Sequence, residues 1–156
     1  MQNMHRFRYG GLNTKGIYVG EDVKRMANAH QMIMGVLIDS LLEVNDTKRA
    51  LAVCQKWQKE MPQDNVPYTE SALSMARCFY TANQLKQGDE IVNDLLRRAD
   101  EWLSWIGTIT PSRRQGSDYS RYVWLKTMQQ ALLVASQYDR TEIIQQYIHQ
   151  YEHNCQ

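Results

Sequence analysis

Residues 26–62 constrain the fold more than any other stretch of the 156-residue sequence. Their apolar side chains recur three or four positions apart in two runs, which places each run on one face of a helix. A polar turn at residues 45–47 separates the runs, Asp46 is a suitable N-cap for the second helix, and Pro62 ends that helix. The faces expected to be buried comprise Met26, Ala29, Ile33, Leu37, Leu41 and Val44 in the first helix and Ala50, Cys54, Trp57 and Met61 in the second. This stretch therefore predicts a helical hairpin.

The same helical pattern continues to the C-terminus. Apolar spacing and turn residues predict further helices over about 70–83, 86–106, 118–138 and 140–153. Gly88 and Ala50 are small residues at matching early positions of their helices, and they lie 38 positions apart, a slightly expanded version of the tetratricopeptide period of about 34 residues. We therefore expect an all-α fold of three stacked helical hairpins, a tetratricopeptide-like α-α superhelix.

Residues 1–20 differ from the rest of the chain because four glycines interrupt any helical pattern there. Neither a GxxxxGK[ST] nor a GxGxxG spacing is present, so the glycines do not predict a phosphate-binding loop. We expect an extended glycine-rich N-terminal arm over residues 1–20 and a helical repeat domain over residues 21–156. The side chains expected to hold the arm against the first helices are Phe7, Tyr9, Leu12 and Tyr18.

Composition narrows the function. The formal net charge is +1, which gives no electrostatic argument for nucleic acid as a partner. The longest apolar run, residues 32–44, contains Asp39 and is shorter than the roughly 20 residues of a membrane span. Three cysteines without a CxxC spacing predict neither a disulfide framework nor a zinc site. Cys54 and Cys78 lie on predicted apolar faces, either as free thiols or as a bridge.

No catalytic constellation is recognisable. The sequence lacks a serine elbow, an HExxH motif and a Cys/His pair in a known motif context. His149 and His153 are four positions apart and could share a zinc ion, yet no motif supplies a third ligand, so a solvated helix end is the better interpretation. We expect a non-enzymatic chain without cofactor or metal. A metal-dependent or hydrolytic enzyme that uses these histidines is the less favoured reading.

Aromatic and basic residues near residues 113–124 are the best candidates for a binding site. Tyrosine, tryptophan and arginine are enriched at the energetic centres of interfaces. The predicted groove presents Tyr119, Tyr122 and Trp124 with Arg113 and Arg114 at its rim, to a protein or peptide partner or to a glycan. Trp102 and Trp105 could line it as well, and the same arginines with Arg97, Arg98 and Arg121 could instead form an anion-binding patch. If the rings belong to the core, no groove exists.

A family resemblance adds to these patterns. RYGGLNTKGIYVGEDVKRMANAH at residues 8–30 is followed by the predicted hairpin ending at Met61-Pro62 and by Val66-Pro67-Tyr68. Over residues 8–68 the chain resembles the soluble C-terminal tail of a family of large multi-pass bacterial membrane proteins, common in Bacteroides-like organisms. The membrane part of that family is similar to protein O-mannosyltransferases. Beyond residue 68 the pattern is that of a generic helical repeat, and the loop at residues 107–116 departs from simple repeat spacing.

The resemblance implies a larger protein, with a membrane anchor upstream of residue 1 and this tail on the periplasmic side of the cytoplasmic membrane. Catalytic acids in such enzymes belong to the membrane half, so none is assigned here. The implied role is to recruit an acceptor protein, a partner subunit or a glycan. Basic residues outnumber acidic ones over residues 1–25, which beside a span favours the cytoplasmic side and opposes this expectation. The alternatives are a tail that braces the parent membrane domain or forms a homodimer, and a free-standing helical-repeat adaptor.

Overall fold

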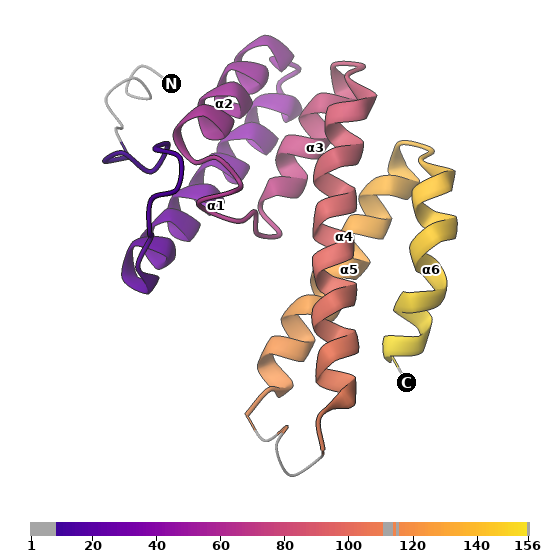
Figure 1. Ribbon diagram of the computed structural model, residues 1–156. Coiled ribbons are helices and arrows are strands. Elements are labelled where there is room, and N and C mark those ends of the chain that lie inside the picture. The colour runs from indigo at the N-terminus through magenta and orange to yellow at the C-terminus, as the bar shows by residue number, and fades with distance from the viewer. Residues whose placement is uncertain (1–8, 111–113, 115, 156) are drawn as a thin grey trace. The chain divides into compact units, whose positions relative to one another are not determined.

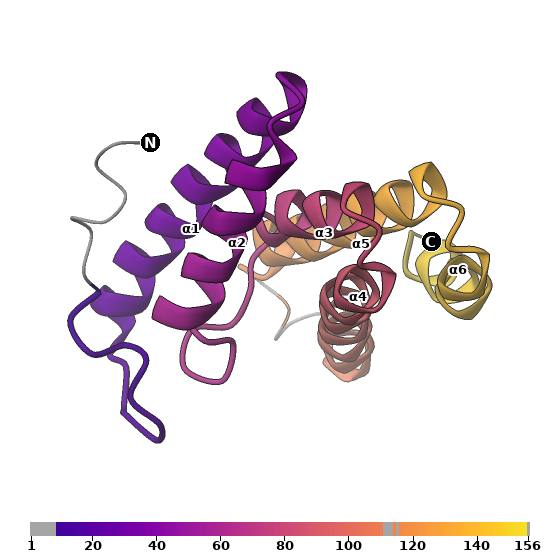
Figure 2. The same cartoon turned by 90° about the horizontal axis from the view of Figure 1, so that it is seen from above.

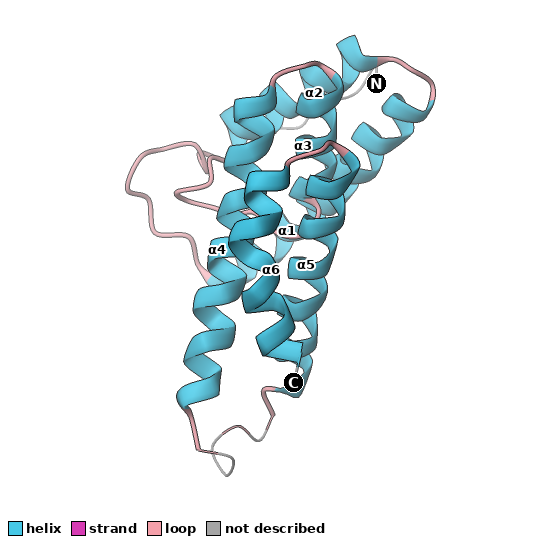
Figure 3. Cartoon of the chain, turned by 90° about the vertical axis from the view of Figure 1, so that its right-hand side faces the viewer, coloured by secondary structure: helices cyan, strands magenta, loops and turns pink. Residues whose placement is uncertain are grey.

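The computed structural model describes residues 9–110, 114 and 116–155. Regular structure in this part of the chain is entirely helical, as Figures 1 and 3 show, and the expected all-α fold is confirmed. The helices are α1 (Glu21–Glu43), α2 (Thr47–Glu60), α3 (Ala72–Thr81), α4 (Leu85–Thr108), α5 (Asp118–Gln137) and α6 (Thr141–Cys155). None of the helices among the described residues is both long enough and apolar enough to cross a membrane.

The chain divides into two compact units, Met1–Ala82 and Asn83–Gln156. In the first unit α1 and α2 lie side by side as a hairpin, which Figure 2 shows from above, and α3 packs against both. In the second unit α4 packs against α5 and α6, and these two helices also pack against each other. Each unit therefore contains a helical hairpin with a third helix that covers it.

The core of the first unit forms around α2 and α3. Ala50, Cys54, Trp57 and Met61 are all fully buried, which confirms the face expected for α2. Asp46 also caps α2 as expected, because its carboxylate accepts a hydrogen bond from the backbone N–H of Arg49 at 3.1 Å. Cys54 and Cys78 are buried free thiols. The hydrogen bond with Cys78 and then its own burial raise the pKa of the Cys54 thiol, so it stays protonated.

The buried face of α1 differs from the expectation. The helix buries Ala27, Gln31, Met34, Gly35, Ile38 and Leu41. Of the expected face only Leu41 is buried, whereas Met26, Ile33 and Val44 are 66%, 61% and 70% exposed. That expectation was wrong because α1 carries apolar residues on two sides, and spacing alone cannot say which side meets α2 and α3. The close approach to α3 decides it, since a Cβ added at Gly35 would lie 3.0 Å from the Ser71 carbonyl oxygen.

A buried glutamine fixes the loop between α2 and α3 onto α1. The Gln31 carbonyl oxygen accepts from the Thr69 backbone N–H at 3.2 Å and from the Thr69 hydroxyl at 3.1 Å. Its amide donates to the Pro67 carbonyl at 3.3 Å. Because Gln31 is fully buried, these bonds are what permits a polar side chain at this core position.

Residues 9–20 belong to the first unit and contain turns but no helix or strand. Leu12 is buried as expected, and the ring of Tyr9 meets that of His30 edge-on at 5.2 Å. The Asn65 amide donates to the Leu12 and Thr14 carbonyls at 2.7 and 2.9 Å, a pair of contacts that the apolar pattern did not indicate. The anchoring role expected of Tyr18 is wrong, because its side chain is 88% exposed. The other expected anchor, Phe7, lies outside the described residues.

The second unit is centred on the long helix α4. Its buried side chains Leu95, Leu96 and Ala99 pack with α5 and α6, which contribute Met128, Ala131, Ile143 and Tyr147. At the turn that joins α5 to α6, the Arg140 guanidinium makes two parallel hydrogen bonds to the Asp89 carboxylate, at 2.8 and 2.6 Å. Asp89 belongs to α4, so this pair holds the turn onto the first turns of that helix.

Candidate functional site

The best candidate site is an aromatic surface on α4 and α5, which we call the tryptophan patch: Arg98, Glu101, Trp102, Trp105 and Trp124. Trp102 and Trp124 stack with ring centroids 6.5 Å apart and an interplanar angle of 28°. Trp105 meets Trp102 at 6.2 Å in an edge-on arrangement. The patch surrounds an open hollow of about 340 Å³.

Helical spacing places these residues together. Arg98, Trp102 and Trp105 are separated by four and then three positions, so they form one row along α4. Trp124 reaches the row from α5, which packs alongside α4. Trp102 and Trp124 are half-buried, and Trp105 is 57% exposed. Two rings are therefore held by packing, and they support a third that faces solvent.

Charged groups border the rings. The Arg98 guanidinium lies 5.5 Å from the centroid of the Trp124 ring, a cation–π distance, and donates to the Asp94 carboxylate at 3.3 Å. Glu101 accepts from Arg97 at 2.7 Å, and Arg97 also binds Asp94 at 2.9 Å. These hydrogen bonds, that from Glu101 foremost, raise the pKa of Arg97. The patch thus has apolar faces and a rim of ordered charges.

The structure does not bring the predicted groove together as one surface. Trp124 joins the tryptophan patch, but Tyr122 precedes it by two positions, and side chains two positions apart point in very different directions on a helix. Tyr119 is five positions before Trp124, about 140° around the helix axis. Both tyrosines are largely exposed, at 77% for Tyr119 and 62% for Tyr122. They lie on a different side of α5 from Trp124.

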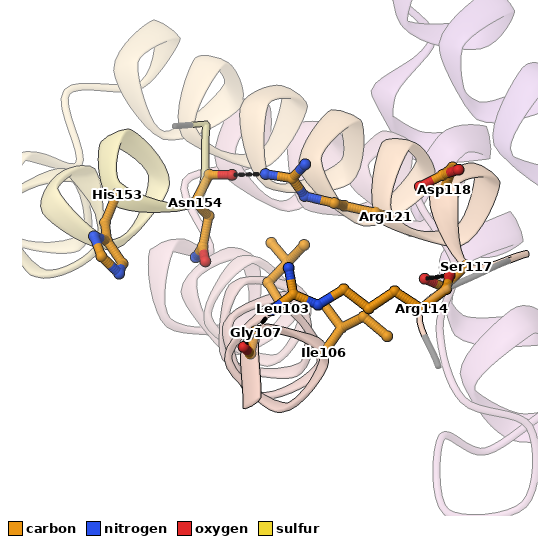
Figure 4. A pocket seen from close by; sticks show the side chains of 9 residues that line it. All are labelled: Leu103, Ile106, Gly107, Arg114, Ser117, Asp118, Arg121, His153 and Asn154. Atoms are coloured by element: carbon orange, nitrogen blue, oxygen red, sulfur yellow. Dashed lines mark hydrogen bonds between the residues drawn. The ribbon is translucent and has the colours of Figure 1, made fainter. Parts of the chain in front are cut away.

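The predicted rim arginines have other surroundings. Arg113 lies outside the described residues. Arg114 turns its guanidinium to the C-terminal end of α4, where Nε donates to the Ile109 carbonyl and an Nη to the Gly107 carbonyl, both at 2.6 Å. Figure 4 shows this side chain at the end of α4. The last carbonyls of a helix lack partners within the helix, so Arg114 acts as a C-terminal cap.

A second hollow, of about 330 Å³, lies beside Arg114 in the same unit and is drawn in Figure 4. Its polar lining includes Ser117, Asp118, Arg121, His153 and Asn154. Arg121 donates to the Asn154 carbonyl at 2.9 Å, so it caps the end of α6 much as Arg114 caps α4. Among the arginines weighed as an anion-binding patch, the four that the structure describes donate to carbonyls or carboxylates: Arg97, Arg98, Arg114 and Arg121.

The sequence singled out Trp102, Trp105 and Trp124 but grouped them with the wrong neighbours. The three-and-four spacing of Arg98, Trp102 and Trp105 was the signal that could have found the row on α4. What the sequence could not show is that Trp124 stacks on this row, because that contact joins residues far apart in the chain.

The described part of the chain contains no cluster of three or more His, Cys, Asp or Glu side chains that could hold a metal ion. His149 is exposed on α6 and its ring lies 3.8 Å from the Glu152 carboxylate. The residues of the tryptophan patch are suited to binding by contact rather than to proton or group transfer.

Comparisons with known proteins add no identification. No family model matches the sequence, no curated protein matches it, and no solved structure matches the fold.

Proposed function

We propose that this chain is a non-catalytic helical-repeat interaction domain and that the tryptophan patch binds a protein or peptide partner. The observation that carries this proposal is the arrangement of the three rings. Trp105 is exposed while Trp102 and Trp124 are fixed by stacking, so a large apolar contact surface exists before any partner arrives. Pre-organised tryptophan costs little conformational entropy on binding and is the residue most enriched at interface hot spots.

The patch favours a particular kind of segment. The hollow is open and bordered by ring faces, so it suits one or two apolar side chains of a peptide, whereas a small-molecule ligand needs a pocket that encloses most of its surface. Arg98 and Glu101 at its border supply one charge of each sign, which suits a peptide with polar groups on either side of an apolar anchor. A glycan is the second candidate, because the ring faces could also stack on sugar rings.

Local turn geometry supports the helical-repeat part of the proposal. The second residue after each of α1, α3 and α5 is Asn45, Asn83 or Asp139, and all three have positive φ, between 56° and 59°. Asparagine and aspartate tolerate this left-handed conformation better than other side chains, and it ends a helix sharply. The same turn chemistry thus follows the first helix of each of the three expected hairpins, which agrees with a repeated hairpin unit.

The binding proposal is tested by selection with a random peptide library displayed on phage and, in parallel, with a glycan array. We expect selected peptides that bind wild type and lose at least about tenfold in affinity with Trp105→Ala. Tyr122→Ala is the matched control, since it removes a ring of similar exposure from another side of α5. Equal losses for both variants, or binding that ignores Trp105, would refute the proposal. Glycan binding that depends on Trp105 would identify a glycan, and not a peptide, as the ligand of the tryptophan patch.

We further propose that the domain is the extracytoplasmic C-terminal part of a membrane protein related to glycosyltransferases, where it recruits acceptor protein, partner subunit or glycan. This rests on the resemblance over residues 8–68. Reading the gene upstream of residue 1 tests it, because a parent membrane domain requires several apolar spans of about 20 residues there. An alkaline phosphatase fusion to the C-terminus of the full-length protein then reports the membrane side. A reading frame without such spans would leave a free-standing adaptor.

A further inference from the structure

The side of α1 that faces solvent is unusually apolar. Large hydrophobic side chains are exposed at five positions of α1 and at Val44 directly after it: Val23, Met26, Met32, Ile33, Val36 and Val44. At roughly 100 Å² each they present about 600 Å², which is at the upper end of the largest apolar patch on a typical monomer. Such a face is either an interaction surface or a solubility liability. The spacing of the residues along this face favours an interaction surface.

The face has the pattern of a helix–helix seam. Met26, Ala29, Ile33, Val36 and Ser40 follow one another at alternating steps of three and four, the a and d positions of a heptad repeat. We call these five positions the α1 seam. Helices that pair in this way insert each a or d side chain between residues of the partner helix. In the first unit α2 and α3 pack against the opposite side of α1, so the seam is left without a helix.

The seam is complementary to itself when two copies run in opposite directions. A two-fold axis between residues 34 and 35 places Ile33 against Val36 of the second copy and Ala29 against its Ser40. Large residues then meet large ones at the centre, while small ones flank them and allow the backbones to approach closely. A parallel pairing would place like positions against each other and lacks this match.

Charge also favours the antiparallel arrangement. Glu43 lies in the last turn of α1, where the negative end of the helix dipole disfavours a carboxylate and where no basic residue is present. In an antiparallel pair Glu43 comes beside the first turns of the partner helix, with its positive dipole end and the exposed Arg25. Arg25 already forms an ion pair with Asp22 in its own helix. In the antiparallel dimer, the Glu43 carboxylate of the second copy would come close to the same guanidinium.

We propose that two copies of this chain associate through the α1 seam in an antiparallel, two-fold symmetric dimer. Full burial of all six exposed apolar side chains in both copies would remove about 1,200 Å² from solvent, the lower end of the range for specific interfaces, so we expect the dimer to form reversibly. This inference is independent of the tryptophan patch, because the seam belongs to the first unit and the patch to the second.

Sedimentation equilibrium of the full chain from micromolar to millimolar concentration tests the association. We expect a monomer–dimer equilibrium between 18.3 kDa and twice that mass. Ile33→Lys should raise the dissociation constant at least about tenfold, because the new lysine and the same lysine of the second copy would both be buried near the two-fold axis. Leu133→Lys is the control, because Leu133 on α5 is also exposed, at 49% against 61% for Ile33, and its replacement should leave the equilibrium unchanged. A chain that stays monomeric, or a dimer that Ile33→Lys does not weaken, would overturn the proposal.

Disulfide trapping tests the direction of the helices. In a Cys155→Ser background, which removes the exposed native thiol, the double variant Ala29→Cys, Ser40→Cys should oxidise to a covalent dimer. The two new thiols of one chain are about 16 Å apart along α1 and cannot bridge each other. Neither single variant should cross-link, since each lacks its opposite partner. Cross-linking of the single variants would show parallel pairing and refute the antiparallel geometry.

Discussion

Two isoleucines of α1 provide the sharpest test of the fold, because they are the same residue type five positions apart in one helix. Ile38 is fully buried and Ile33 is 61% exposed. We expect Ile38→Ala to destabilise the protein strongly and Ile33→Ala to leave its stability nearly unchanged. The spacing of apolar residues predicts Ile33 in the core, whereas the structure buries Ile38. The two variants therefore test which of the two faces of α1 is buried.

The magnitudes follow from burial. Replacing a fully buried isoleucine by alanine typically costs 2–5 kcal/mol, and the complete burial of Ile38 puts the expected loss at about 3 kcal/mol. The higher helix propensity of alanine returns about 0.4 kcal/mol at either site. At Ile33 the gain in helix propensity roughly offsets the free energy lost with the small buried apolar area. The expected change in the free energy of unfolding is therefore within about 0.5 kcal/mol.

Urea unfolding of the full chain, followed by circular dichroism, measures both variants. A loss of about 3 kcal/mol shifts the midpoint by about 1.5 M at a typical slope of 2 kcal/mol per M. The measurement is made at two protein concentrations a hundredfold apart, so that association through the α1 seam is not counted as folding. A large loss for Ile33→Ala at the lower concentration, with a small one for Ile38→Ala, would refute the buried face assigned to α1.

Three further predictions concern polar groups. Gln31→Leu should lower the free energy of unfolding by about 2–3 kcal/mol in the same urea assay, because the N–H and hydroxyl of Thr69 lose their acceptor. Arg140→Lys should cost about 1 kcal/mol, since lysine keeps the charge but cannot make two parallel bonds to Asp89; a loss equal to that of Arg140→Met would contradict this. Burial, and after it the charge of Asp100, raises the pKa of Tyr147 above its ordinary 10.0. The protonated Tyr147 side chain therefore stabilises the fold below pH 10, and this stabilisation is lost as the pH rises further. Thermal unfolding across pH 9–11.5 should therefore show a shallower decline for Tyr147→Phe than for wild type.

Local signals in the sequence were enough to predict the helices. The turn at Asn45, the cap at Asp46 and the buried face of α2 all lie where spacing and capping chemistry predicted them. These features depend on residues within one or two helical turns of each other, so a window of sequence contains all the information they need.

The candidate site was predicted only in part. Trp102, Trp105 and Trp124 were noted, but Trp124 was assigned to a surface with Tyr119 and Tyr122 that two- and five-residue spacings on one helix do not allow. Arg114 was placed at the rim of that surface, whereas it caps α4. Its acceptors are backbone carbonyls. Every residue has a carbonyl group, so the sequence does not indicate which carbonyls will accept from a given arginine.

By itself the sequence determined that the chain is helical, where most helices begin and end, and which face of α2 is buried, because each is set by short-range spacing and capping. Tertiary structure alone decided which apolar side of α1 enters the core, because two sides compete and only the approach of Gly35 to α3 excludes one. It alone also decided that Trp124 stacks on Trp102, since packing between α4 and α5 joins rings more than twenty positions apart.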